Sequence, residues 1–252
     1  MSEELNGILP VEIGLYKNEL YTQGKNEFIL TSIDIASGIG ILKEDKFFVE
    51  AETIAYFTTR VAMLDLMAAG GEPVIISFAT SLANNYYDDI EAGILKLLSE
   101  WSLDMNLKIT GSTEDNFKSK QTSISIMITG IAIKDKLRWL QAEREDNLFI
   151  IGEPLVGEKV LSQRDKVISA EVFQLLMKDK STKNIIPIGS GGAIQRIKNI
   201  LNKTGLKYKS LNNELENISA GPATAVLLIS NASFDYYRDK IDIPITYLGK
   251  LI

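Results

Sequence analysis

The sequence contains no cysteine and no histidine among its 252 residues. Without cysteine, the chain has no disulfide, no thiolate zinc site and no thiol nucleophile. Without histidine, it lacks the commonest general base, the Ser-His-Asp triad and imidazole metal ligands. Any catalysis must therefore use carboxylates, lysine, arginine, hydroxyl groups, backbone amides or cations held by oxygen atoms.

The chain also lacks long apolar runs and an excess of positive charge. No window offers the run of about 20 apolar residues that spans a bilayer, and the first residues, MSEELNG, lack the pattern of a signal peptide. The net charge of −6 argues against a nucleic-acid partner. It leaves nucleotides open, because Mg²⁺ can bridge acidic residues to phosphate. We therefore expect a cytoplasmic protein that binds neither nucleic acid nor a membrane.

The pattern of apolar residues predicts an α+β fold. Apolar and charged contents of 45% and 24% are ordinary for a globular protein, and the length allows one large domain or two modest ones. The charged stretch 134–147 is expected to be a connecting helix or a domain boundary. The expected helices are 50–73, 84–101, 169–177 and 193–204. The expected strands are 27–36, 74–80, 107–110, 122–133, 148–151, 184–188, 223–230 and, at a sheet edge, 243–251.

The helix expected over 50–73 carries a carboxylate on or beside its apolar face. Gly70 and Gly71 predict the end of this helix, and Pro73 prevents its continuation. Asp65 is either buried, and then hydrogen-bonded, paired or bound to a metal, or it reaches water from the edge of the apolar stripe. The stripe consists of Ile54, Phe57, Val61, Leu64 and Ala68.

Four acidic residues lie at the ends of expected elements or in a polar loop, namely Asp34, Asp65, Glu114 and Asp115. If their segments converge, they form a cluster of oxygen ligands suited to Mg²⁺. Residues with free amides or hydroxyls that could then contact phosphate are Gly38, Gly40, Gly111, Ser112 and Thr113. Gly189 and Ser190 follow a strand and precede a helix, where phosphate could also bind. Plain glycine turns and solvated acids remain the alternative for each segment.

Several segments resemble a known family. D-L-M-A-A-G-G-E-P at 65–73 is similar to the D-L-A-A-x-G-A-x-P helix end of the PurM-like superfamily, which is related to aminoimidazole ribonucleotide synthetase. G-S-T-E-D-N-F at 111–117 is similar to the G-S-T-E-E-N-F loop of its α-ribazole kinase branch. D-I-A-S-G-I-G at 34–40 and S-A-G-P at 219–222 also resemble segments of that branch. Where thiamine-monophosphate kinase has G-G-D-T, this chain has G-S-T-E, so either Glu114 or Asp115 would replace the aspartate.

The resemblance implies a two-domain PurM-like fold. An N-terminal domain, 1–135, would hold a mixed sheet with helices, the ATP and metal site and the dimer interface. A smaller α/β domain, 136–252, would follow. The implied activity is ATP-dependent phosphorylation of α-ribazole on its primary ribose hydroxyl. The implied partner is a second copy of the chain, joined through the N-terminal sheets.

The residues can be placed in roles on this basis. Asp34, Asp65 and Glu114 would hold Mg²⁺, Asp115 would orient the acceptor hydroxyl, and Arg60 would contact phosphate unless it is a solvated helix charge. The nucleotide phosphates would meet Gly38, Gly40, Gly111, Ser112, Thr113, Gly189 and Ser190. Two alternatives remain: a kinase or synthetase for another acceptor, such as a thiamine or purine precursor, and a non-catalytic protein that binds a nucleotide or α-ribazole.

Overall fold

The computed structural model describes residues 10–12, 18–22, 26–103, 107–211 and 213–252. The chain forms two compact units, one ending at Leu137 and the other running from Arg138 to Ile252. The division lies inside the charged stretch 134–147. Each unit has its own sheet.

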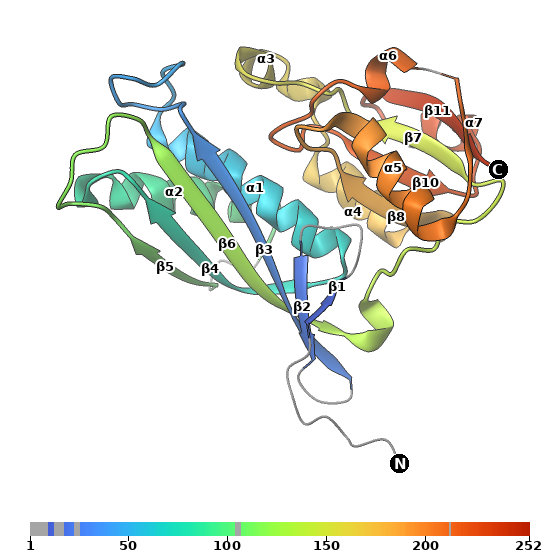
Figure 1. Cartoon of the computed structure of the whole chain (residues 1–252), viewed down its shortest axis with the longest axis horizontal. Helices are drawn as coiled ribbons and strands as arrows, with labels where there is room; N and C mark the ends of the chain where they lie inside the picture. The colour runs from blue at the N-terminus through green and yellow to red at the C-terminus, as the bar shows by residue number, and fades with distance from the viewer. Residues whose placement is uncertain (1–9, 13–17, 23–25, 104–106, 212) are drawn as a thin grey trace. The chain divides into compact units, whose positions relative to one another are not determined.

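The first unit is built on a six-stranded sheet (Figure 1). Its strands, in spatial order, are β1 (Pro10–Glu12), β2 (Asn18–Thr22), β3 (Glu27–Ser37), β6 (Ser123–Ile133), β4 (Glu72–Thr80) and β5 (Lys108–Ser112). Neighbouring strands are antiparallel, except that β4 and β5 run parallel. The central pair, β3 and β6, stays in register along its whole length.

Two helices cover one face of this sheet. α1 (Ala51–Ala68) packs on β3, β6 and β4, and α2 (Tyr87–Glu100) packs beside α1. Strand side chains alternate between faces, so Leu30, Ile76 and Ile128 are buried under the helices. The opposite face carries a row of exposed apolar side chains, which we call the open face. Its apolar residues are Ile33, Ile35, Val74, Ile75, Met127, Ile131 and Ile133.

Glycines set how closely the parts of this unit approach. A Cβ atom at Gly93 of α2 would lie 2.2 Å from the carbonyl oxygen of Glu52, so only glycine lets the two helices cross there. Gly70 has a φ of +92° and would place a Cβ atom 2.0 Å from the carbonyl oxygen of Lys136. The expected helix is therefore confirmed, and its stop depends on Gly70, although Ala69 occupies the C-cap itself.

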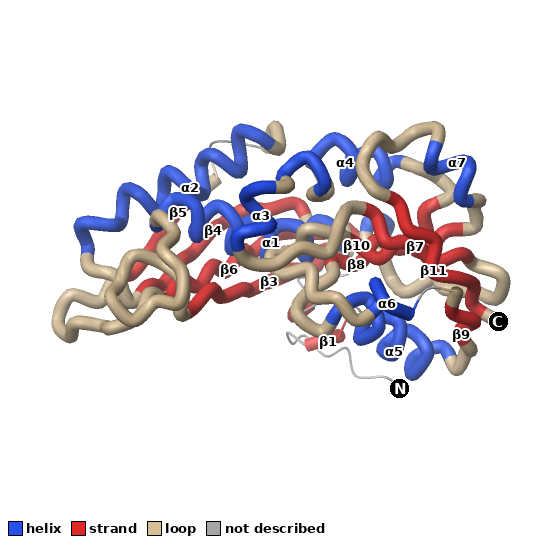
Figure 2. The backbone as a smooth tube through the Cα atoms, turned by 90° about the horizontal axis from the view of Figure 1, so that it is seen from above, coloured by secondary structure: helices blue, strands red, loops and turns tan. Residues whose placement is uncertain are grey.

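The second unit has a five-stranded antiparallel sheet with helices on both faces. Its strands, in spatial order, are β8 (Thr182–Pro187), β10 (Val226–Ser230), β7 (Asn147–Ile151), β11 (Ile245–Leu251) and β9 (Tyr208–Ser210). The helices are α3 (Glu158–Ser162), α4 (Ala170–Lys178), α5 (Gly192–Thr204), α6 (Asn213–Glu216) and α7 (Phe234–Arg238). Figure 2 shows α4 and α7 on one side of the sheet and α5 and α6 on the other. Because both faces are covered, every residue of β10 is buried.

Two signals in the second unit are confirmed and one expectation is wrong. The Ser169 hydroxyl caps α4 by accepting a hydrogen bond from the Val172 amide at 3.2 Å, and Gly205 ends α5 with a φ of +71°. The segment 243–251, expected at a sheet edge, instead lies between β7 and β9. The edge strand beside β11 is β9, which is three residues long and too short to give an apolar pattern.

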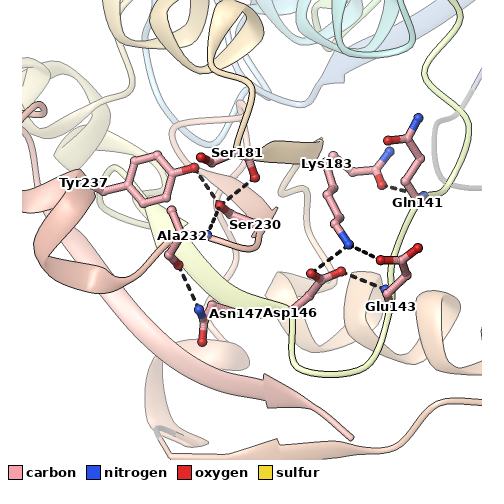
Figure 3. A network of polar contacts seen from close by, with 10 residues as sticks. Gln141, Glu143, Asp146, Asn147, Ser181, Lys183, Ser230, Ala232 and Tyr237 are labelled. Carbon is pink, nitrogen blue, oxygen red and sulfur yellow. Dashed lines mark hydrogen bonds and ion pairs between the residues drawn. The ribbon is translucent and has the colours of Figure 1, made fainter.

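A buried ion pair fixes the chain that leads into β7 (Figure 3). The Lys183 ammonium on β8 lies 3.0 Å from Oδ1 of Asp146 and 2.5 Å from Oε2 of Glu143. The other oxygen of Asp146 accepts a hydrogen bond from the Glu143 amide at 2.7 Å. The Asp146 side chain is only 3% exposed, so Lys183 supplies the charge that a buried carboxylate requires.

Candidate functional site

Three loops meet at one edge of the six-stranded sheet. Strands β3, β4 and β5 end at this edge and β6 begins there, because Ser37 pairs with Ser123 and Ala79 pairs with both Ser125 and Ser112. The loops are 38–50, 81–86 and 113–122, and together they form what we call the loop end, at the upper left of Figure 1. The structure thus brings the Gly38–Gly40 turn close to the loop that follows β5.

Asp45 and Thr122 join the first loop to the third. The Asp45 carboxylate accepts hydrogen bonds from the amide of Thr122 at 2.8 Å, from its hydroxyl at 2.6 Å and from the amide of Leu42 at 2.8 Å. The Gly38 amide donates to the carbonyl oxygen of Thr122 at 3.0 Å. Bonds to a charged acceptor are stronger than neutral ones, so the glycine turn is held firmly against β6.

Ser81 ties the second loop to the same place. Its hydroxyl donates to the carbonyl oxygen of Gln121 at 3.1 Å and accepts from the Ser123 amide at 2.9 Å. We did not identify Asp45, Thr122 or Ser81 as site residues from the sequence. An acid shortly after a glycine turn was the available signal for Asp45, and nothing in the pattern singled out Ser81.

Two of the glycines expected to contact phosphate have packing roles. A Cβ atom at Gly40 would lie 2.3 Å from Oγ1 of Thr122, and one at Gly111 would lie 2.1 Å from the ring of Phe78. Gly111 and Ser112 were expected in a loop, but they extend β5 and pair with Phe78 and Ala79. The missing side chain at Gly111 leaves room for the Phe78 ring, which also contacts Tyr87 at 4.9 Å between centroids.

The two loop acids brace the third loop. Asp115 accepts hydrogen bonds from the Asn84 amide at 2.9 Å and from the Thr113 hydroxyl at 2.8 Å. The Asn84 amide, and then the Thr113 hydroxyl, hold the pKa of Asp115 below its ordinary value. Oε1 of Glu114 accepts from the amides of Asn116 at 2.8 Å and Phe117 at 3.1 Å. Both carboxylates are therefore engaged in fixing the shape of the loop.

Asp34 and Asp65 lie on the helix-covered side of the sheet. Asp34, half-buried, sits on β3 opposite Ile126, two residues beyond Ser32 towards the loop end. The Ser32 hydroxyl donates to the carbonyl oxygen of Ala62 on α1 at 2.7 Å. Asp65 follows Ala62 by three residues and is only 2% exposed.

The register of α1 separates these two acids. A Cβ atom at Gly130, which pairs with Leu30, would lie 2.8 Å from the side chain of Leu66, so α1 runs antiparallel to β3. Asp34 and Asp65 therefore lie on opposite sides of the Ser32–Ala62 contact, separated by roughly 11 Å along the strand. The water-reaching alternative for Asp65 is wrong, because its side chain is buried.

Among the described residues, no three acidic side chains lie close enough together to form a metal site by themselves. The assignment of Asp34, Asp65 and Glu114 as metal ligands stays a prediction. Mg²⁺ often uses only one or two carboxylates and completes its shell with phosphate oxygens and water. The carboxylates of Asp34 and Asp65 have the right chemistry for that arrangement, whereas Glu114 already accepts two amide hydrogen bonds.

Arg60 is not a solvated helix charge. It is 2% exposed on α1, and its guanidinium carbon lies 5.7 Å from the centroid of the Trp101 ring. Trp101 follows α2 directly, so Arg60 lies between the two helices. A cation over an indole face is stabilised by the ring quadrupole. The role of Arg60 in phosphate contact stays a prediction.

Gly189 and Ser190 belong to the second unit and precede α5. The carbonyl oxygen of Gly189 accepts from the amides of Gly192 at 3.1 Å and Ala220 at 3.3 Å, and Ser190 is exposed. Gly192 has a φ of +69°, and a Cβ atom there would lie 2.6 Å from the carbonyl oxygen of Glu216. The 189–192 turn therefore packs against 216–220, and it leads directly into α5, a helix of 13 residues.

No family model matches the sequence, and no curated protein is significantly similar to it. Solved structures do match. AaThiL complexed with AMPPCP and TMP has a TM-score of 0.65 at 13% identity, over 96% of this chain and 86% of that chain. Thiamine monophosphate kinase from Aquifex aeolicus has a TM-score of 0.63 at 13% identity, over 98% and 89%. The enzyme from Stenotrophomonas maltophilia has a TM-score of 0.60 at 16% identity, over 98% and 89%.

A HypE–HypF complex gives a TM-score of 0.59 at 14% identity, over 92% of this chain and 86% of that chain. The fold is PurM-like. The expected fold class, α+β with PurM-like architecture, is thereby confirmed. At identities this low, the similarity establishes the fold alone.

Proposed function

We propose that this protein is an ATP-dependent kinase that phosphorylates the primary ribose hydroxyl of α-ribazole. The observation that carries the proposal is the loop end, where the Gly38–Gly40 turn and the 113–122 loop are held together by Asp45, Thr122 and Ser81. The same PurM-like fold supports an ATP analogue in a structural relative. The α-ribazole acceptor is supported by the resemblance of 111–117 to the loop of that kinase branch.

Phosphoryl transfer asks a protein mainly to position its reactants and to neutralise charge. The acceptor hydroxyl oxygen forms a bond to the γ-phosphorus, the bond from that phosphorus to the bridging oxygen of ADP breaks, and the hydroxyl proton leaves to a carboxylate or to phosphate. When bound, Mg²⁺ would neutralise the phosphate charges, held by Asp34, the acid on the loop-end side of the Ser32–Ala62 contact. Asp115 is a weak base because its pKa is lowered, so we assign it to holding and orienting rather than to proton abstraction.

We further propose that the protein is a homodimer joined through the open face. Apolar side chains on β3, β4 and β6 are exposed on this face. An apolar patch of this extent usually marks a contact surface. A second copy covers it symmetrically, because a two-fold interface uses the same patch on both chains. Because ATP is the phosphate donor, we place the protein in the cytoplasm. None of the helices in the described ranges combines the length and apolarity of a membrane span.

The test is incubation with ATP, Mg²⁺ and α-ribazole, followed by mass analysis of the nucleoside and measurement of ADP. We expect a product heavier by one phosphoryl group, and loss of most turnover in Asp34→Asn. Asp65→Asn tests whether the acid farther from the loop end also holds metal. Parallel reactions with thiamine monophosphate and other nucleosides test a different acceptor. That alternative is favoured specifically by the relative that binds TMP. Thermal stabilisation by ligands without ADP formation would instead identify a binding protein.

A further inference from the structure

Phe117, at the tip of the 113–122 loop, exposes more of its surface than any other large apolar side chain in the described residues. It is 79% exposed, and Phe48 of the neighbouring loop is next at 73%. Full burial of a phenylalanine is favourable by about 1.5–3 kcal/mol. Leaving two such rings in water at one edge of a sheet therefore indicates a binding role for that edge.

The backbone that carries Phe117 is fixed. Its amide donates to Oε1 of Glu114 at 3.1 Å, and the same oxygen holds the Asn116 amide at 2.8 Å. Asp115 anchors the loop to Asn84, and the Ser119 hydroxyl donates to the carbonyl oxygen of Gln121 at 2.7 Å. The exposed ring is thus presented from a braced loop, and little ordering remains to be done when a ligand arrives.

The surroundings of Phe117 fit a small polar ligand better than a protein surface. The residues that flank Phe117 in its loop are polar: Thr113, Asn116, Lys118 and Ser119 carry hydroxyl, amide and ammonium groups. Protein interfaces instead gather contiguous apolar side chains, as on the open face. An aromatic ring with a few polar groups beside it is the usual composition of a site for a heterocyclic ligand.

We infer that Phe117 stacks on a flat heteroaromatic ring of the ligand bound at the loop end. Glu114 and Asp115 are positioning residues that hold the loop carrying it. The ring has one of two sources, the adenine of ATP or the base of the acceptor nucleoside, which share a π face that a phenyl ring can cover. The inference rests on the proposed function, since it assigns a further residue to that site.

The test measures binding by calorimetry, without turnover, for four probes: ATP, inorganic tripolyphosphate, adenosine and α-ribazole. Phe117→Ala should weaken the ring-bearing probe that it contacts by about tenfold, equivalent to about 1.4 kcal/mol. Tripolyphosphate binding should not change. Phe117→Tyr should retain affinity, and Phe117→Leu should not. Leu211→Ala, which removes a side chain 64% exposed in the other unit, is the matched control and should bind every probe normally.

The outcomes distinguish stacking on the adenine of ATP from stacking on the base of the acceptor nucleoside, and both from no stacking at all. Weakened ATP and adenosine binding assigns the ring to adenine, and weakened α-ribazole binding alone assigns it to the acceptor; either supports the inference. Unchanged affinities in Phe117→Ala, equal loss for tripolyphosphate, or full affinity in Phe117→Leu overturns it while leaving the kinase intact. So does a change of oligomeric state in Phe117→Ala, which would place the ring in a subunit contact. Failure of the wild-type protein to bind any probe would overturn the proposed function as well.

Discussion

A methyl group on Gly40 has no room, because Oγ1 of Thr122 would be 2.3 Å away and Gly40 has a φ of +149°. We predict that Gly40→Ala lowers the free energy of unfolding by about 3 kcal/mol or more, from strain and overlap together. Thermal unfolding measures this. Gly157→Ala is the control, since Gly157 has a φ of +60° but nothing within 4 Å; it should lose only about 1–2 kcal/mol. Equal losses in both variants would show that the contact with Thr122 is unimportant.

Asp179, which follows α4, should make the free energy of unfolding depend on pH in the acidic range. Burial alone would raise the pKa of Asp179, but the Ser181 amide, the Tyr236 hydroxyl and Lys240 together lower it below its ordinary value. A carboxyl with a lowered pKa stabilises the fold fully above its unfolded pKa of about 4. That contribution is lost as pH falls through the folded pKa.

We therefore predict that Asp179→Asn costs about 1–3 kcal/mol at pH 7, measured by urea unfolding, and that the difference from wild type narrows below about pH 4. Asp235→Asn is a suitable control, because the Asp235 side chain is exposed and pairs with Arg238 on its own helix at 2.8 Å. A difference that stayed constant down to pH 2 would contradict the charge-based explanation.

The sequence indicated which segments carry candidate site residues better than what those residues do. Strand ends and polar loops are visible in the pattern, and they pointed to the segments of Gly38, Gly40, Glu114 and Asp115. The sequence could not show that Gly111 leaves space for Phe78, or that both loop acids are used by nearby backbone amides. Those facts depend on three-dimensional contacts between segments far apart in the chain.

At the scale of elements, the ion pair between Lys183 and Asp146 fixes the chain entering β7 to β8 (Figure 3). Lys183→Met would leave the Asp146 carboxylate buried without its counter-charge, so we predict a loss of about 3 kcal/mol in the stability of the second unit. Adding Asp146→Asn should recover much of the loss, since asparagine can still accept from the Glu143 amide. Denaturation of the single and double variants measures both effects, and additive losses would exclude coupling.

Long elements with a strong period were predictable, and short ones were not. β6 and α5 were expected almost to the residue, since their patterns are long and α5 ends at Gly205. The short helices α3, α6 and α7 were not expected, because four or five residues carry no readable period. The sequence of a strand also does not show which strands pair with it, and for this reason the prediction that β11 lies at a sheet edge was wrong.

At the scale of the whole molecule, the proposed dimer depends on the open face. Ile35 is exposed on β3 in that face. We predict that Ile35→Asp shifts the protein to monomers, because burying an unpaired carboxylate at an apolar interface costs several kcal/mol. Sedimentation velocity over a range of concentrations measures the shift. Leu211→Asp, on an exposed residue of the second unit, should leave the oligomeric state unchanged. A wild-type monomer at every concentration would contradict the dimer.

At the loop end, some residues hold the loops in place and others are free to contact a ligand, and this difference can guide redesign of the protein. Asp45, Thr122, Ser81 and Asp115 hold the loops to the sheet and to one another, so a mutant library that varied them would mostly loosen the loops. Randomising Phe48, Phe117 and Lys118 instead would change what the loops touch while keeping their frame. A new ligand preference should therefore be reachable by exchanging a few tip residues, with no insertion or deletion.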